Sequence, residues 1–181
     1  GVFCITLFLK NEFSYDTAHT KANRIYRLTI TSLDFAKGNH FARVFNSEQI
    51  PNLYEQIPEI ETAVRMMPLR DKLILKKGQY YSIKQAFAVD DTFLNLFNVK
   101  LEKGSPNNQL VEPGTALISK SLAQKVFGDE NAVGETILLP PGHFNTLETN
   151  FTITGVMEDF EQQSHLHPDL LVMPGKNVIS G

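Results

Sequence analysis

Two histidines near the C-terminal end are the residues whose spacing best suits metal chemistry. His165 and His167 flank a single leucine, and Asp159 and Asp169 lie nearby in the chain. In an extended segment, residues two apart point the same way, so both imidazoles could reach one metal ion. Further ligands would have to come from elsewhere, and surface or hydrogen-bonding histidines are commoner than ligating ones. We therefore predict no metal site and no cofactor.

Carboxylates gather at two further places, Asp90 with Asp91, and Glu158 with Asp159 and Glu161. General acid–base catalysis requires a pair of groups whose environments separate their pKa values. Adjacency along the chain does not provide such environments. Asp90 is better explained as a helix cap and the later group as a solvated loop, so we predict no catalytic residue.

Other reactive signatures are absent from the sequence. A P-loop, a dinucleotide fingerprint, a G-x-S-x-G elbow and a zinc-protease helix are all missing, so the chain is not itself a P-loop ATPase. The only cysteine, Cys4, sits in an apolar run that favours the inert thiol, and a single cysteine excludes an intrachain disulfide.

A basic region with neighbouring tyrosines is the one feature that would suit nucleic acid. Its residues are Arg70, Lys72, Lys76, Lys77, Tyr80, Tyr81 and Lys84. Nucleic-acid binders normally carry a basic excess, whereas this chain has 17 basic and 20 acidic residues and a formal charge of −3. The solvated face of a β-hairpin explains the pattern better, and we predict no nucleic-acid partner.

The elements that must position these residues are short and mixed. The 181 residues are 42% hydrophobic and 20% charged, as in an ordinary globular domain. An alternating pattern predicts a strand at 25–31, and further apolar runs predict strands at 60–67, 73–76, 80–87, 115–118, 133–139 and 151–156. Ser14 or Asp16 could cap a short helix within 14–27. Apolar residues at helical spacing predict helices at 47–57, from Asp90 to Phe97, and after Ser119 up to Gly128. Loops are predicted at 34–40, at Lys77–Gln79 and from Pro140 to Asn150. This interleaving indicates an α+β fold.

The front of the chain departs from these averages. Val2–Leu9 reads VFCITLFL, apolar apart from Thr6. A membrane-spanning helix needs roughly 20 such residues, so this run cannot span by itself. From the residues alone, either a buried strand or the outer end of a truncated membrane helix fits, and composition favours the strand.

Four segments, in order, resemble one family. They are Asn11–Leu28 (NEFSYDTAHTKANRIYRL), Val89–Pro106 (VDDTFLNLFNVKLEKGSP), Ile118–Ile137 (ISKSLAQKVFGDENAVGETI) and Phe151–His165 (FTITGVMEDFEQQSH). Together they are similar to the MacB-like periplasmic core domain of FtsX-type ABC-transporter permeases, with the nearest likeness in Bacteroidetes. The resemblance covers most of residues 11–169. It implies that Val2–Leu9 is the outer end of the first membrane helix, which reverses the preference for a strand.

The resemblance also implies an architecture of two intertwined lobes. Residues 1–10 would be the remnant of the first membrane helix or a linker. Residues 11–88 with 149–181 would form a porter-like α/β sandwich lobe, and residues 89–148 a small inserted α/β lobe. Within the inserted lobe, Phe93 and Phe97 would fill the core, Gly128 would end a helix, and Gly134 would turn the chain into the next strand. Relatives usually carry more extracytoplasmic sequence after the segment matching Ser164-His165, so this member is either short or trimmed.

The function implied by the resemblance is non-catalytic. The domain would lie on the periplasmic side of the inner membrane and couple ATP-driven movement of membrane helices to substrate export or force transmission. Its partners would be a cytoplasmic ATP-binding subunit and a second copy of the permease or a related permease, with a periplasmic adaptor protein as a further candidate. Two alternatives are a stand-alone extracytoplasmic module that binds a ligand or protein, and a hydrolase that uses a carboxylate or His165 and His167.

Overall fold

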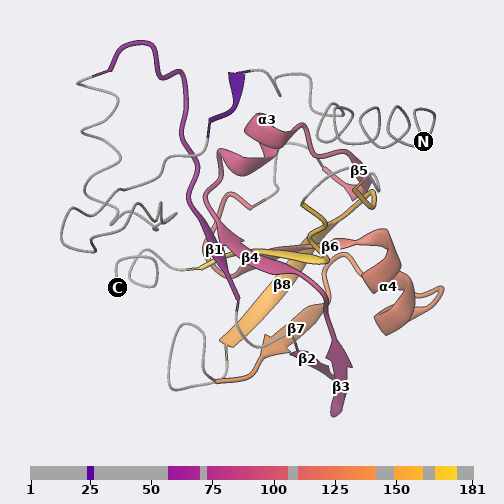
Figure 1. Ribbon diagram of the computed structural model, residues 1–181. Coiled ribbons are helices and arrows are strands. Elements are labelled where there is room, and N and C mark those ends of the chain that lie inside the picture. The colour runs from indigo at the N-terminus through magenta and orange to yellow at the C-terminus, as the bar shows by residue number, and fades with distance from the viewer. Residues whose placement is uncertain are drawn as a thin grey trace, which may run out of the picture.

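We describe the protein from a computed structural model, which defines residues 24–26, 57–69, 73–105, 110–141, 149–160 and 166–174. The helix predicted within 14–27, the strand at 25–31, the loop at 34–40 and the helix at 47–57 lie wholly or almost wholly outside these ranges. Within the ranges, one mixed β-sheet and two short helices form the fold (Figure 1). The α+β prediction is therefore confirmed.

Nine short strands make up the sheet. They are β1 (Met66–Pro68), β2 (Leu73–Lys76), β3 (Gln79–Ser82), β4 (Ala86–Val89), β5 (Leu101–Gly104), β6 (Thr115–Ser119), β7 (Thr136–Leu139), β8 (Thr149–Met157) and β9 (Leu170–Met173). Their order across the sheet is β1-β4-β9-β6-β8-β7-β2-β3, and β5 pairs with the end of β8. Two neighbouring pairs, β4 with β9 and β6 with β8, run parallel, and the other neighbours are antiparallel.

The central strands are apolar on both faces, because a helix packs on each side of the sheet. In β6, Ala116 and Ile118 join the cluster beneath α4 (Lys120–Phe127), while Leu117 points to the cluster beneath α3 (Phe93–Phe97). β9 alternates in the same way, with Leu171 on the α3 side. Strands covered on both faces read as continuous hydrophobic runs, which is why TALIS and LLVM lack a polar face.

Helix α4 has the caps that its sequence predicts. The Ser119 hydroxyl accepts a hydrogen bond from the Leu122 backbone N–H at 3.1 Å, which satisfies one of the first free donors of the helix. Gly128 ends the helix at φ 59° and ψ −123°, a backbone conformation that residues with a Cβ atom rarely adopt. Leu122 and Phe127 are the buried residues of this helix.

Helix α3 was also predicted, but its cap was not identified correctly. Thr92, rather than Asp90 or Asp91, occupies the N-cap position, and its side chain makes no capping hydrogen bond. The Thr92 hydroxyl instead donates to the carbonyl of Ala63 at 2.9 Å. Phe93 is fully buried and its ring centroid lies 4.6 Å from that of Phe97, so both phenylalanines do occupy a core.

Several strand boundaries differ from the predictions. The run from Tyr80 to Phe87 divides into β3 and β4, which pair with β2 and with β1 and β9 respectively. The strand predicted at 60–67 is limited to β1, and those at 133–139 and 151–156 are β7 and β8. Sequence reasoning missed β5, whose LEKG pattern is largely polar, and β9, which precedes a proline.

Strands from both proposed lobes share the sheet. β6 and β7 lie within 89–148, and they pair with β8 and β9, which lie within 149–181. The boundaries at residues 88 and 148 stay a prediction, since much of the proposed porter-like lobe lies outside the described residues.

Candidate functional site

The segment that carries His167 and Asp169 is tied to the connection between β3 and β4. The His167 backbone N–H donates to Oε1 of Gln85 at 2.8 Å, and the Lys84 N–H donates to Oδ2 of Asp169 at 2.5 Å. The Gln85 carbonyl also accepts from the Asp169 N–H at 2.8 Å. These contacts bring the chain into β9. His165 lies outside the described residues, and within them no three metal-ligating side chains come together.

Asp159 lies in an exposed segment after β8, as predicted for this group of acids, and its carboxylate also binds the start of α4. Its Oδ1 accepts from the Ser121 backbone N–H at 3.1 Å, and its Oδ2 accepts from the Ser121 hydroxyl at 2.6 Å. Glu158 is exposed, and its backbone N–H donates to the carbonyl of Lys100 at 2.9 Å. Glu161 lies outside the described part. A carboxylate at a helix start satisfies free N–H donors, so Asp159 joins the end of β8 to α4.

Asp90 binds Arg65 in a bidentate ion pair. Arg65 Nη2 lies 2.6 Å from Oδ1, Nε lies 2.8 Å from Oδ2, and the Arg65 backbone N–H donates to the same Oδ2 at 3.0 Å. Both side chains are mostly buried, at 20% and 18% exposed. The hydrogen bond to Asp90 raises the pKa of Arg65, which keeps the guanidinium charged. The contact fastens the segment before β1 to the corner between β4 and α3.

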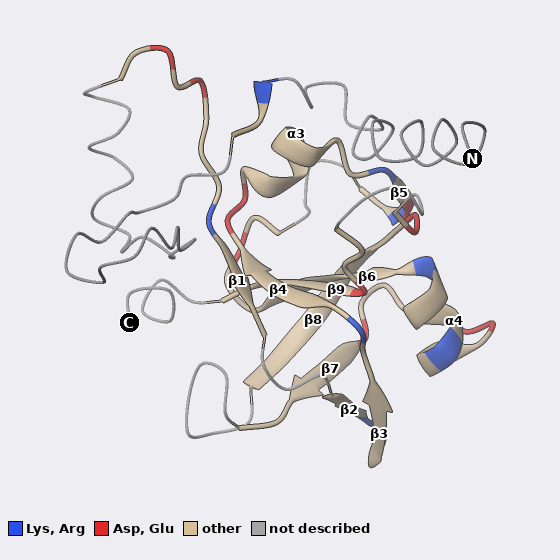
Figure 2. Cartoon of the chain, viewed as in Figure 1, with Lys and Arg blue, Asp and Glu red and all other residues tan. Residues whose placement is uncertain are grey.

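The basic region around the β2–β3 hairpin is largely neutralised by acidic neighbours. Lys76 Nζ lies 2.5 Å from Glu135 Oε2, accompanied by a 2.9 Å bond to the Thr136 carbonyl. Lys77 pairs with Glu130 at 3.4 Å. Basic and acidic positions are interspersed along the described part of the ribbon (Figure 2). Arg70 and Lys72 lie outside the described ranges.

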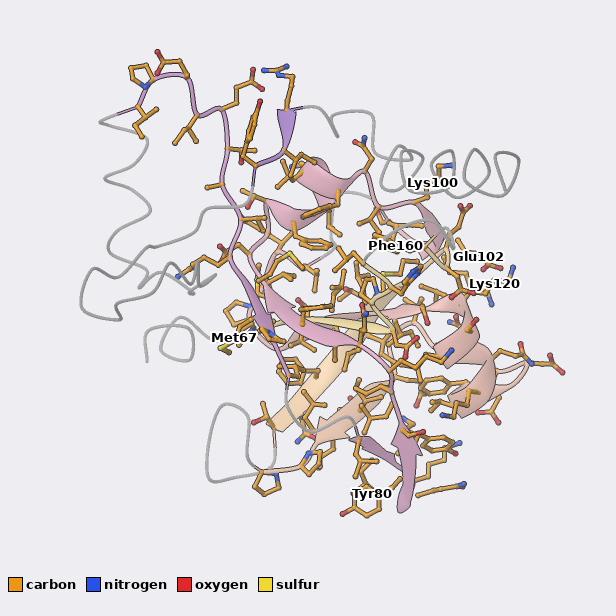
Figure 3. The ribbon with its side chains drawn as sticks, viewed as in Figure 1. Met67, Tyr80, Lys100, Glu102, Lys120 and Phe160 are labelled. Atoms are coloured by element: carbon orange, nitrogen blue, oxygen red, sulfur yellow. The ribbon has the colours of Figure 1, made fainter. Side chains whose placement is uncertain are left out.

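A further ion pair joins β5 to α4. Lys120 Nζ lies 3.1 Å from Glu102 Oε1, and Figure 3 shows these two side chains at one corner of the domain with Lys100 and Phe160. Lys120 is 62% exposed, so the pair contributes little to stability. An exposed ion pair such as Lys120–Glu102 does not by itself indicate a binding site.

These polar side chains connect separate elements of the fold. Asp90, Asp159 and Asp169 each bind a residue far away in the sequence. Sequence reasoning singled out the three acids but did not predict the partners of their carboxylates, which are Arg65, Ser121 and the Lys84 backbone. The only signal for Arg65 was a charged residue inside an apolar predicted strand, which suggests a buried partner.

The apolar run at the front of the chain, with Cys4 in it, lies outside the described residues. Within the residues that the structure describes, none of the helices is long and apolar enough to cross a membrane.

Comparison with known proteins identifies the family. The model of the MacB-like periplasmic core domain matches residues 1–180, and the chain therefore belongs to that family. This membership makes it a periplasmic domain of a MacB-like ABC-transporter permease, located on the extracytoplasmic side of the membrane.

Solved structures agree with the family. One is a domain of a putative permease protein from Porphyromonas gingivalis, with 26% identity and a TM-score of 0.60 over 78% of this chain and 59% of that one. A second is the periplasmic region of MacB from Actinobacillus actinomycetemcomitans, with 14% identity and a TM-score of 0.53 over 83% and 64%. A third is the extracellular domain of the noncanonic ABC-type transporter YknZ from Gram-positive bacteria, with 16% identity and a TM-score of 0.52 over 72% and 63%.

The last two likenesses are below 25% identity and show the fold alone. The chain spans 59% to 64% of the length of these three structures. No curated protein matches it.

Proposed function

We propose that this domain transmits movement within an ABC-transporter permease and carries out no chemistry of its own. The observation that carries the proposal is the use of its polar side chains. Asp90, Asp159 and Asp169 each cross-link separate elements of the fold. A domain that must move as one body requires such cross-links, whereas a catalytic site requires polar groups that are held ready for a substrate.

The proposed cycle begins in the cytoplasm. ATP hydrolysis by a separate nucleotide-binding subunit changes how the membrane helices pack, and the external domain moves with them. That movement drives the export of a substrate or passes force to a partner protein. The permease works with a second copy or a related permease, and a periplasmic adaptor is a further candidate partner.

Two features suit the domain to this task. Four consecutive strands of the sheet, β4, β9, β6 and β8, contain many residues that are fully buried between α3 and α4, so the centre of the domain resists deformation. The Arg65–Asp90 pair ties the segment leading into β1 to that centre. A displacement of this segment would therefore move the sheet as well, because the ion pair holds the two together.

The test uses the full-length permease with its nucleotide-binding subunit in lipid nanodiscs. A spin label is attached at Lys77→Cys, on the exposed hairpin turn, in a background in which Cys4 and every other cysteine of the permease are replaced by serine. The distances between labels on the two permease copies are then measured by pulsed electron resonance. We expect the distribution of distances to shift when ATP is trapped in the complex, and not when the nucleotide-binding subunit is inactivated. Identical distributions in both states, with ATP still hydrolysed, would contradict the proposal.

Arg65→Ala provides the second arm of the test. Because the substitution loosens the connection into β1 and leaves the nucleotide-binding subunit intact, we expect ATP hydrolysis to continue while the label shift becomes smaller. Lys77→Ala, placed in the otherwise unlabelled protein, is the matched control and should leave ATP hydrolysis unchanged, since its ion pair with Glu130 is solvent-exposed.

A further inference from the structure

Strand β3 ends the described sheet order at the side opposite β1. It is the second strand of a tight hairpin in which Lys77 and Gly78 form the turn, both at positive φ (49° and 78°). Two positive φ values define a type I′ turn, whose flanking residues exchange hydrogen bonds. The Tyr80 side chain is 58% exposed and points away from the rest of the domain at the hairpin tip (Figure 3).

The pairing register determines which backbone groups of β3 face outward. Because Lys76 and Gln79 form the hydrogen-bonded pair beside the turn, the next pair, Leu75 with Tyr80, is not hydrogen-bonded. The N–H and C=O of Tyr80 therefore point away from β2, and the same groups of Ser82 do so as well. Within the described part of the chain, β2 is the only strand that pairs with β3.

Lys125 binds one of these outward groups. Its Nζ lies 2.6 Å from the Ser82 carbonyl oxygen and 3.1 Å from the Ser82 hydroxyl oxygen. Lys125 belongs to α4, 43 residues away in sequence. Since the Ser82 carbonyl points away from β2, the ammonium group bound to it lies where a neighbouring strand would approach.

We propose that the outer edge of β3 is a strand-pairing surface for a second copy of this chain, and that Lys125 holds it closed. Exposed sheet edges pair readily with other strands, and lysine is a common means of preventing this. The proposal goes beyond the transmission of movement and does not depend on it.

A second copy fits this edge because of geometry and charge. A two-fold axis through Tyr80 would place the outward N–H and C=O of one Tyr80 opposite those of its counterpart, so that the two residues exchange both hydrogen bonds. The same axis would place Gln79 opposite Tyr81. None of the residues of β3 is charged, so the pairing brings no like charges together.

The turn limits the extent of such pairing. Beyond Tyr80, the next hydrogen-bonded position would join Ser82 to Gly78 of the counterpart, and Lys125 already holds the Ser82 carbonyl. With Lys125 in place, only the Tyr80 pair remains, and this is too little to hold two copies together.

The test measures the mass of the 181-residue chain by light scattering after size exclusion, over a range of concentrations. Lys125→Met and Lys125→Gln both remove the charge, and the first keeps the length of the side chain. We expect each variant to reach twice the mass of the wild type at concentrations where the wild type does not associate. Lys125→Arg retains the donors and should behave as the wild type does.

Two further variants separate edge pairing from other causes. Lys120→Met makes the same charge change on the same helix, away from β3, and should leave the mass unchanged. Tyr80→Pro, added to Lys125→Met, removes an outward N–H that β2 does not use, so it should restore the wild-type mass. Unchanged mass in both Lys125→Met and Lys125→Gln, equal association of Lys120→Met, or persistence of the dimer in the Tyr80→Pro double variant would each overturn the proposal.

Discussion

Among single residues, Arg65 and Asp90 make the polar contact with the most direct bearing on stability. Three donors of Arg65 converge on one carboxylate, and both side chains are about four-fifths buried. Removal of one partner leaves the other charge buried without compensation, which is costly.

We therefore expect Arg65→Ala to lower the free energy of unfolding by about 2 kcal/mol, the usual magnitude for hydrogen bonds to a charged group. Urea denaturation measures the change. The matched control is Lys77→Ala, whose ion pair is 71% exposed on both sides and should matter by less than about 0.5 kcal/mol. Equal losses in the two variants would show that the Arg65 pair is no stronger than a surface one.

Glu135 gives a prediction of pH dependence. A hydrogen bond from Lys76, reinforced by the attraction of its charge, lowers the pKa of Glu135 below its ordinary value of 4.5. A group whose pKa is lowered on folding stabilises the protein above its unfolded pKa and loses that contribution as the pH falls through the folded pKa.

The expected outcome is that wild type is more stable than Glu135→Gln at neutral pH and that the difference shrinks in acid. Urea midpoints measured at a series of pH values provide the comparison. Lys76→Met should weaken the acid dependence in the same way, because it removes the other half of the pair. A difference between wild type and Glu135→Gln that stays constant down to strongly acidic pH would refute this explanation.

At the scale of elements, the β2–β3 hairpin contains a residue that does not suit its turn. Lys77 has a φ of 49°, a value that asparagine adopts more readily than lysine, and Asn-Gly is the preferred pair in type I′ turns. We expect Lys77→Asn to raise the free energy of unfolding by about 0.5 kcal/mol, after the loss of an exposed ion pair.

Thermal denaturation followed by circular dichroism measures this effect. Lys77→Val is the contrasting variant, since a β-branched residue is strained at positive φ and should lower the melting temperature. If Lys77→Asn and Lys77→Val shift the melting temperature in the same direction, the turn conformation is not the cause.

How far the sequence predicts an element depends on whether its signals are local. Ser119 and Gly128 act within one turn of α4, so the helix and both of its ends were predictable. Asp90 carries an equally strong capping signal, but Arg65, 25 residues earlier, competes for its carboxylate. The division of Tyr80–Phe87 into two strands depends on β9, which pairs with β4, and on Asp169 just before β9, whose carboxylate accepts from the Lys84 N–H. A pattern read along the chain contains none of these distant partners.

The candidate site follows the same rule. Asp90 was predicted to cap a helix and Asp159 to lie in a solvated loop, while Asp169 was noted only as a neighbour of the two histidines. Their job became clear only from the groups that they bind, namely Arg65, Ser121 and the Lys84 backbone. The family resemblance came from four segments that follow one another in a fixed order along the chain, rather than from any single residue. The family match over residues 1–180 confirms it.

For the whole molecule, the sheet predicts a gradient of local stability. Leu117, Leu170 and Leu171 in the central strands are fully buried, while β3 at one end of the described sheet is mostly exposed. Amide hydrogens exchange through local opening, which is easier where few apolar contacts hold a strand.

Hydrogen–deuterium exchange measured by mass spectrometry should therefore be slowest in peptides from β6 and β9 and fastest, among strands, in β3. β1, a three-residue strand whose one partner among the described residues is β4, should also exchange early. Protection of β3 equal to that of β6 would show that another part of the chain, or another copy, covers this edge.

The pairing registers bring two strand ends that are far apart in the sequence to the same side of the sheet. Met66, the first residue of β1, is paired with Val89 of β4, and the parallel register of β4 with β9 continues from Ala88 with Val172 toward Val89 with Met173. The start of β1 and the end of β9 thus lie in one row, separated by a single strand, which corresponds to about 10 Å. The chain therefore enters β1 and leaves β9 at the same end of the sheet, so a pull on the segment before Met66 and a pull on the segment after Met173 would act on neighbouring points of one sheet.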